Sequence, residues 1–323
     1  MIVLAHVGAP NIFFQIRNFD VPLMVIVSGM SFGLAFKGEP FVQYLWKRIK
    51  RLIFPVWIFL TIFFVSVYLF KPSKDYLNWE IIFTSYFFIS GIGYVWIIRV
   101  FVLVALVAPF IYSQSNKTKN DVLFLTQLLF IYVIYEICRY ILLPYTYDGL
   151  GRYLSLIFFY LVPYSILFAF GLTLPKLKMK CNIQLLLYFS LCFISLALYL
   201  WITTGSFVST QNYKYPPSIY YFSYAIAISI FLWLVGDSLL VTIEKYKRLN
   251  RIIIFVAHNS IWIYLWHIPL VKIIHLNFFF NYLLVFSIAL MITFMQVSLV
   301  TNILIPALPN DKMKKNAKMI LTG

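Results

Sequence analysis

The stretch KRIKRLIFPVWIFLTIFFVSVYLF, residues 47–70, decides the fold class. Its first five residues include four Lys or Arg, and residues 53–70 then contain no charged side chain. A run of about 20 apolar residues is long enough to cross the roughly 30 Å hydrocarbon core of a bilayer as a helix. Basic residues at one end of such a run indicate the cytoplasmic side.

Apolar stretches of this kind recur along the whole chain. Of its 323 residues 63% are apolar and 11% are charged, and the mean hydropathy is +0.89. This composition excludes a soluble globular protein and predicts one integral membrane domain over residues 1–323, with a basic cytoplasmic tail at about 307–323. The net charge of +16 then marks cytoplasmic loops rather than nucleic-acid binding. The three cysteines form no CxxC and no Cys/His cluster, so they indicate neither a disulfide framework nor a metal site.

The apolar runs predict an all-α bundle of about ten transmembrane helices. Lipid offers the backbone no hydrogen-bond partners, and the runs are too long for barrel strands, so each is expected to be a helix. The short apolar segment 81–90 is expected to be a surface or re-entrant element. The helices are expected near residues 1–14, 19–36, 53–70, 93–113, 122–143, 154–174, 183–204, 218–241, 253–275 and 280–306.

Alternate connections between these helices differ in basic charge. One set holds 18 Lys and Arg and the other holds 7, so the positive-inside rule places the first set, and with it both termini, in the cytoplasm. The basic set comprises 37–52, 114–121, 175–182, 242–252 and 307–323, and the other set comprises 15–18, 71–92, 139–153, 204–217 and 272–279.

Ionisable residues inside a span are costly and usually face the bundle interior or a wet cavity. Glu136 and Arg139 lie three apart on one expected helix, so they can neutralise each other or contact a substrate. The cluster at 47–51 can set orientation and touch anionic lipid head groups, or it can bind phosphates, to which guanidinium groups are suited. The ionisable residues inside the expected spans are His6, Asp20, Arg99, Glu136, Arg139, Asp237, His258 and His267.

We expect different roles for two of the histidines, His6 and His267. In HNSIWIYLWHIPLV, residues 258–271, Ser260 and His267 are seven apart and share a helical face. A lone intramembrane histidine of this kind is more often a packing residue than a catalyst. His6 is better placed as a general base, because histidine titrates near neutrality and can take a proton from a hydroxyl. Asp20, at the outer end of the next span, can orient His6 or hold a polar substrate.

Six motifs follow one another along nearly the whole chain. They are IVLAHVGAP (2–10), FDVPLMVIVSGMSF (19–32), KRIKRLIFP (47–55), GYVWIIRVFVLVALVAP (93–109), KYPPSIYY (214–221) and NSIWIYLWHIPLV (259–271). In this order they resemble the bacterial membrane acyltransferase-3 family, polytopic O-acyltransferases that decorate cell-surface polysaccharides. The resemblance rests on the first-helix histidine, the Ser-Gly pair of the second helix, an R-x-x-R followed by proline, and a W-[FI]-x-R helix.

The resemblance implies a multi-pass enzyme of the bacterial plasma (inner) membrane. It would move an acyl group, commonly acetyl, from cytosolic acetyl-CoA or another acyl-CoA to a hydroxyl of a cell-surface polysaccharide or glycolipid precursor, without a metal. Its partners would be the glycan or glycolipid acceptor, membrane lipids and polysaccharide-biosynthesis proteins, and no nucleic acid. The catalytic residues would be His6 and Asp20, the CoA-binding residues Lys47, Arg48 and Arg51, and the substrate-binding residues Trp96, Arg99, Glu136, Arg139, Ser260 and His267.

One family residue has no counterpart. The family's histidine is preceded by an arginine in an R-x10-H pattern, and at that spacing the arginine would fall before Met1. Residues 1–14 also give about 21 Å of helix, which is short of the roughly 30 Å of hydrocarbon. We therefore expect the chain to be short at its N-terminus.

Two other functions stay open on the sequence. A ten-helix chain with a few buried charges also suits a transporter or flippase of a lipid-linked saccharide or small polar solute. However, no Gly/Pro-broken segments occur at matching positions in two halves, as an inverted-repeat carrier would have. The third function is an assembly component of a polysaccharide synthase that has no chemistry of its own.

Overall fold

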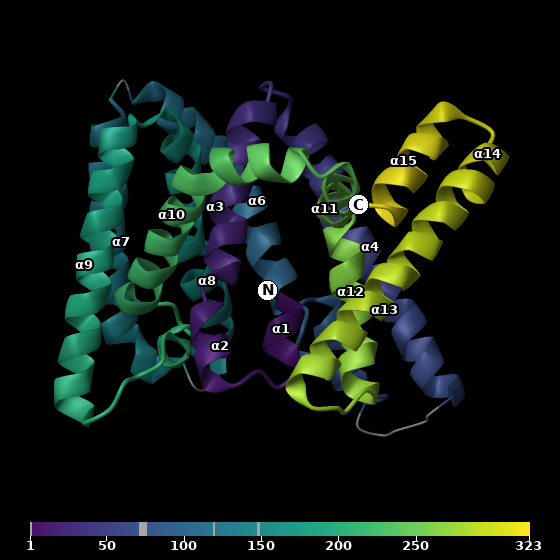
Figure 1. Ribbon diagram of the computed structural model, residues 1–323, viewed down its shortest axis with the longest axis horizontal. Coiled ribbons are helices and arrows are strands. Elements are labelled where there is room, and N and C mark those ends of the chain that lie inside the picture. Colours follow the sequence, from purple (N-terminus) through teal and green to yellow (C-terminus); the bar gives the residue numbers. More distant parts are fainter. Residues whose placement is uncertain (1, 71–75, 119, 147–148) are drawn as a thin grey trace. The chain divides into compact units, whose positions relative to one another are not determined.

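The computed structural model describes residues 2–70, 76–118, 120–146 and 149–323. These residues form helices and contain no β-strand, which confirms the predicted all-α class (Figure 1). The long helices are α3 (Asp20–Ala35), α4 (Phe41–Phe70), α6 (Trp96–Lys117), α7 (Asp121–Leu142), α8 (Gly149–Thr173), α9 (Met179–Thr204), α10 (Ile219–Glu244) and α13 (Phe278–Leu299). The shorter ones are α1 (Ile2–His6), α2 (Asn11–Ile16), α5 (Trp79–Tyr86), α11 (Lys247–His258), α12 (Ser260–Ile273), α14 (Ile305–Ala307) and α15 (Asp311–Leu321).

Within the described part of the chain, eight helical segments are long and apolar enough to cross a membrane. A ninth results if α11 and α12, which meet at an angle of 80°, form one span. Each helix expected from residue 19 onward has a counterpart among these nine. The short apolar segment at 81–90 corresponds to α5, whose eight residues are too few to span.

The expected first helix, 1–14, is the one that differs. Helix α1 ends at His6, Gly8 adopts a left-handed φ of +73°, and Pro10 has no amide hydrogen to continue a helix. Helix α2 then begins at Asn11 and joins α3 in one apolar segment, Asn11–Ala35. The Gly-Ala-Pro sequence therefore divides the apolar run that the composition alone makes continuous.

Many basic residues of the expected connections lie within helices, near the start of α4 and along α11 and α15. Three of the lysines counted for the orientation, Lys71, Lys74 and Lys119, lie outside the described residues. The cytoplasmic location of both termini stays a prediction.

The chain forms two compact units, which we describe separately. Unit 1 comprises the described residues of 1–14, 42–102 and 240–323. Here α12 and α13 pack side by side, and α1 lies against both of them (Figure 1). The end of α15 is attached to the same helices, because the indole of Trp262 donates to the Ile320 carbonyl at 3.1 Å and the Gln296 amide donates to the Leu321 carbonyl at 2.7 Å.

Unit 2 comprises the described residues of 15–41 and 103–239. Its main contact joins α3 to α8, where Gly29 faces the backbone of Phe168 and Gly171 faces the backbone of Ile26. Small residues let helix backbones approach closely in lipid, where hydrophobic burial does not drive helices together. The Ser-Gly pair in the second motif therefore contributes its glycine to helix packing.

Candidate active site

Helix α1 carries His6 at its C-terminal end, in unit 1. Val3 and Val7 are buried against Val285 of α13, which holds the short helix by apolar contact. His6 lies three residues after Val3 and directly before Val7, so its side chain leaves α1 beside this buried face. A helix of five residues is not stable alone, so the position of His6 depends on this packing.

The imidazole of His6 contacts the imidazole of His267 on α12. Nδ1 of His6 lies 2.8 Å from Nε2 of His267, and the two rings are nearly parallel, with an interplanar angle of 13° and centroids 5.1 Å apart. His267 is fully buried, and its Nδ1 hydrogen-bonds the carbonyl oxygen of Tyr264 one turn earlier. The fold thus joins two predicted site residues from opposite ends of the chain.

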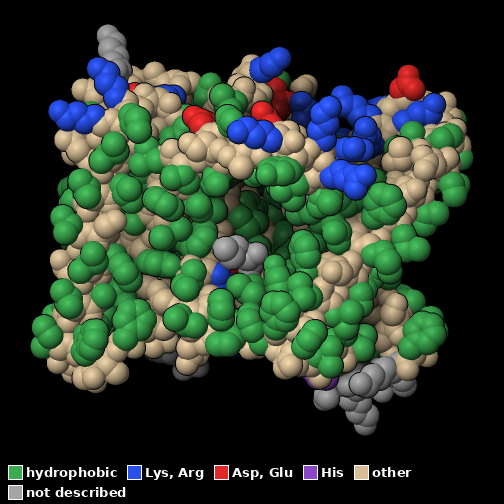
Figure 2. Space-filling view, in the orientation of Figure 1, with side chains coloured by type: hydrophobic (Ala, Val, Ile, Leu, Met, Phe, Trp, Pro, Cys, Tyr) green, Lys and Arg blue, Asp and Glu red, His purple; other side chains and the backbone are tan. Residues whose placement is uncertain are grey.

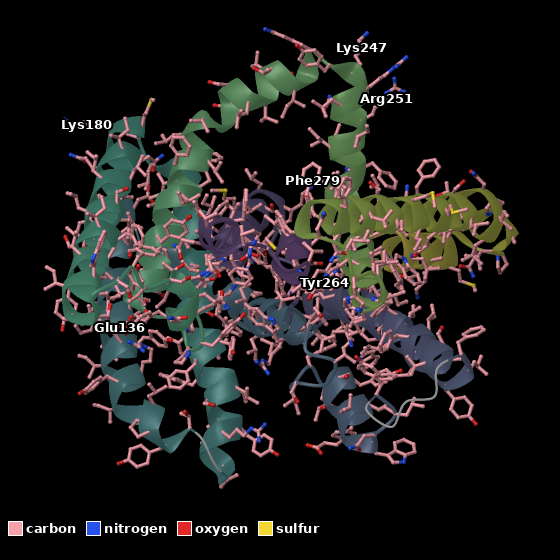
Figure 3. The ribbon with its side chains drawn as sticks, turned by 60° about the horizontal axis from the view of Figure 1, so that its bottom comes forward. Glu136, Lys180, Lys247, Arg251, Tyr264 and Phe279 are labelled. Carbon is pink, nitrogen blue, oxygen red and sulfur yellow. The ribbon has the colours of Figure 1, made fainter. Side chains whose placement is uncertain are left out.

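The ring of Tyr94 also lies against this histidine pair. Its ring meets His6 edge-on at a centroid distance of 4.7 Å and His267 at 6.1 Å. Its backbone carbonyl accepts a hydrogen bond from the hydroxyl of Tyr264, a residue of α12 (Figure 3). The sequence does not single out Tyr94, because one tyrosine in a chain that is 20% aromatic has no distinguishing pattern.

A lysine of α12 lies near the same tyrosine. Lys272 places Nζ 4.1 Å from the ring centroid of Tyr76 and 5.7 Å from that of Tyr94, so aromatic faces stabilise its charge. Lys272 is not singled out by the sequence either, because it lies at the boundary between the expected helix 253–275 and the expected connection 272–279. From sequence alone, a charged site residue at the end of a span looks the same as a charged residue that simply lies at the membrane interface.

Three further predicted substrate-binding residues belong to unit 1. Arg99 donates from one terminal nitrogen to the carbonyl oxygens of Phe88 and Ile89, at 3.2 and 2.8 Å, and so fastens the turn after α5. Trp96 is the half-buried first residue of α6, and Ser260 is the exposed first residue of α12, after the bend. Their contact with a substrate stays a prediction.

The predicted CoA-binding residues lie near the start of α4. Arg48 and Arg51 are three apart and share a helical face, Arg48 is half-buried, and Lys47 and Arg51 are exposed. Lys50 donates to the side-chain oxygen of Asn316 on α15 at 3.0 Å, so α15 lies beside this cluster.

Figure 2 shows Lys and Arg gathered at this end of unit 1, and Figure 3 shows Lys247 and Arg251 projecting from the same end of α11. We call the basic residues of α4, α11 and α15 the basic surface. Its members are Lys47, Arg48, Lys50 and Arg51 of α4, Lys247, Arg248 and Arg251 of α11, and Lys312, Lys314, Lys315 and Lys318 of α15.

Asp20 belongs to unit 2, where it lies in a buried charged cluster. Arg17 donates to one carboxylate oxygen at 2.6 Å, and Nζ of Lys214 lies 3.5 Å from the other. Lys214 also donates to Asn18 at 3.2 Å, which ties the 205–218 loop to the start of α3. Burial lowers the pKa of Lys214, and the nearby Asp20 carboxylate opposes this shift. A catalytic role of Asp20 stays a prediction.

The predicted pair on α7 is formed. Arg139 donates to Glu136 at 2.7 Å, and both side chains are 20% exposed. The other oxygen of Glu136 accepts from the hydroxyl of Tyr132 at 3.0 Å and from the backbone N–H of Ile219 at the start of α10. These contacts favour neutralisation within unit 2 over the substrate contact that the sequence left open.

A family model described as an acyltransferase domain matches residues 1–305. The chain belongs to the acyltransferase 3 family. The acyltransferase 3 match covers His6, the R-x-x-R of α4, Arg99 and His267, and it leaves α15 outside. The described residues of this acyltransferase 3 protein include eight or nine helices that are long and apolar enough to cross a membrane, so it is a membrane acyltransferase. No curated protein and no solved structure matches the chain.

Proposed function

We propose that this acyltransferase is an acyl-CoA-dependent O-acyltransferase of the bacterial plasma membrane, which acylates a hydroxyl of a cell-surface polysaccharide or glycolipid precursor. The observation that carries the proposal is the position of His6 at the end of α1, in contact with the buried His267. A proton acceptor of this kind suits acyl transfer to a hydroxyl, where general-base catalysis contributes about 10²–10⁴-fold to the rate.

The proposed step moves one proton through His6. Its imidazole takes the proton of the acceptor hydroxyl while the hydroxyl oxygen forms a bond to the thioester carbonyl carbon. The bond from that carbon to sulfur breaks, and the imidazolium gives its proton to the leaving thiolate. The ester and the free thiol are formed, and His6 ends in its starting protonation state.

The charge of α4 supports acyl-CoA as the donor. Arg48 and Arg51 share a face, and guanidinium groups bind phosphate oxygens in a paired geometry that fits the phosphates of CoA. Lys47 adds a point charge beside them. The same residues also fit the head groups of anionic lipids, so kinetics with acyl-CoA must separate the two uses.

Transfer of label tests the proposal. Purified protein in vesicles receives acetyl-CoA labelled in the acetyl group and a glycolipid fraction as the acceptor. We expect alkali-labile label in the acceptor with the wild type, and loss of about 10²-fold or more with His6→Ala. His258→Ala, which alters an exposed histidine of α11, is the matched control and should keep the wild-type rate.

Two outcomes would contradict the proposal. Equal label transfer by His6→Ala and the wild type would exclude His6 as the base. No transfer from acyl-CoAs of several chain lengths, together with movement of a lipid-linked saccharide across the vesicle membrane, would replace the enzyme with a transporter.

A further inference from the structure

The hydrogen bonds of His267 determine which of its nitrogens carries a proton. Nδ1 of His267 lies against the carbonyl oxygen of Tyr264. A carbonyl oxygen only accepts hydrogen bonds, so Nδ1 is the donor and carries the hydrogen. In a neutral imidazole the other nitrogen then has the lone pair. Nε2 of His267 is therefore a hydrogen-bond acceptor.

This acceptor faces His6. Nδ1 of His6 lies 2.8 Å from Nε2 of His267, which is hydrogen-bonding distance. Because Nε2 of His267 accepts, Nδ1 of His6 must donate, and neutral His6 then carries its lone pair on Nε2. One backbone carbonyl, acting through one buried ring, thus selects the tautomer of the second ring.

We infer that His267 is a positioning residue for His6, which holds His6 as the Nδ1-protonated tautomer and so directs its basic Nε2 toward the acceptor hydroxyl. The inference rests on the proposed function and gives His267 a role through His6 instead of the predicted contact with substrate. The physical basis is general for histidine, since the hydrogen-bond partner of one ring nitrogen determines whether the other nitrogen is protonated.

The packing around the pair gives His267 the rigidity that this role needs. His267 has no exposed surface, and its neighbours Leu265 and Ile268 are also buried completely. His6 is half-buried at the end of a five-residue helix. The rigid ring therefore orients the less constrained one. When Nε2 of His6 takes a proton, its Nδ1–H still points at Nε2 of His267, so the charged form keeps a hydrogen-bond acceptor and is stabilised.

Three substitutions of His267 separate positioning from packing. His267→Phe fills a similar volume and offers no acceptor. His267→Gln can place an amide oxygen near the position of Nε2, whereas the shorter His267→Asn places its amide near the position of Nδ1 and does not reach His6. We expect kcat to fall about 10-fold or more in the Phe and Asn variants with little change in the KM for acyl-CoA, and substantial recovery in the Gln variant.

The pH profile adds a readout that a packing role would not move. Loss of the acceptor on His267 destabilises protonated His6, so the acidic limb of the kcat/KM profile should move to lower pH in His267→Phe and stay near its wild-type position in His267→Gln. Equal kcat and pH profiles for Gln, Asn and Phe would overturn the inference. His6→Ala, measured in parallel, tests the proposed function separately. If His6→Ala is inactive while His267→Phe is fully active, the positioning role of His267 is refuted and the proposed function stands.

A spectroscopic measurement tests the inference without activity. The chain has four histidines, so ¹⁵N-histidine labelling gives few signals, which single substitutions assign. At a pH where both rings are neutral, we expect His6 to show a protonated Nδ1 and an unprotonated Nε2. In His267→Gln this pattern should persist, and in His267→Phe it should become a mixture of tautomers. A protonated Nε2 of His6 in the wild type would refute the inference even if all variants lacked activity.

Discussion

Gly29 of α3 and Gly171 of α8 each leave room for the backbone of the opposite helix. A Cβ atom at Gly29 would lie 2.1 Å from the Phe168 carbonyl oxygen, and one at Gly171 would lie 2.1 Å from the Ile26 carbonyl oxygen. Backbone atoms inside a packed helix pair cannot move aside as a flexible side chain can. The two glycines therefore determine how closely α3 and α8 approach.

Alanine at either position should destabilise unit 2. We expect Gly29→Ala and Gly171→Ala each to cost about 1–3 kcal/mol through overpacking. The three free cysteines, Cys138, Cys181 and Cys192, all lie in unit 2, so a thiol-reactive dye reports its thermal unfolding in detergent. Gly236→Ala is the matched control, since a Cβ there meets no atom within 4 Å and should leave Tm unchanged or slightly higher. Equal Tm for all three variants would contradict the packing argument.

Removal of the R-x-x-R pair should weaken the binding of the acyl donor more than the binding of the acceptor. For Arg48→Ala combined with Arg51→Ala, we expect the KM for acyl-CoA to rise about tenfold or more, because hydrogen bonds to charged groups contribute about 1.5–3 kcal/mol. The KM for the acceptor should change less. Lys180→Ala, an exposed lysine of α9 in unit 2, should leave both constants unchanged (Figure 3). A larger change for the acceptor would reverse the assigned roles.

The Glu136–Arg139 pair should behave as a stabilising pair. Its two members are in contact, so a double-mutant cycle with Glu136→Gln and Arg139→Gln should give a coupling energy of about 0.5–3 kcal/mol. We expect label transfer to persist in the double variant, since the amide oxygen that replaces the Glu136 carboxylate can still accept from Tyr132 and the backbone of Ile219. Complete loss of transfer in a double variant with wild-type Tm would instead assign the pair to substrate binding.

Unit 2 should gain stability in mild alkali through Lys214. Its folded pKa lies below its ordinary value of 10.5, so between the two pKa values the unfolded chain binds more protons than the folded one. The free energy of unfolding therefore rises with pH in this window. The groups that face Lys214 are Asp20, Arg17, Tyr215 and Tyr221. Burial raises the pKa of Tyr215, so this phenol stays neutral there.

Lys214→Met removes the titrating group and should remove this rise. The measurement is Tm by the thiol dye at several pH values from 8 to about 10.5, with Lys176→Met as the control for an exposed lysine of the same unit. A wild-type Tm that falls across the window as steeply as that of Lys214→Met would contradict the expected sign.

The long helices were predictable because lipid imposes a simple rule on composition. A run such as 53–70 must satisfy its backbone internally and has no charge to keep in water, so it forms a helix whatever its neighbours are. The same rule failed at 1–14, where Gly8 and Pro10 interrupt a mostly apolar run whose polar side chains are His6 and Asn11. Hydropathy measures the solvent that a segment prefers and contains no information on φ or on a missing amide hydrogen.

The site was predictable only in its chemistry. The sequence by itself determined the membrane class, the basic flank of α4 and the helical face that His267 occupies, and it predicts His6 as the base. Only the tertiary structure decided that His6 contacts His267, that Tyr94 lies against both rings, and that Arg17 and Lys214 bind Asp20. The reason is that helix periodicity acts over a few residues, whereas a 2.8 Å contact between residues 261 positions apart depends on how Val3 and Val7 pack against α13.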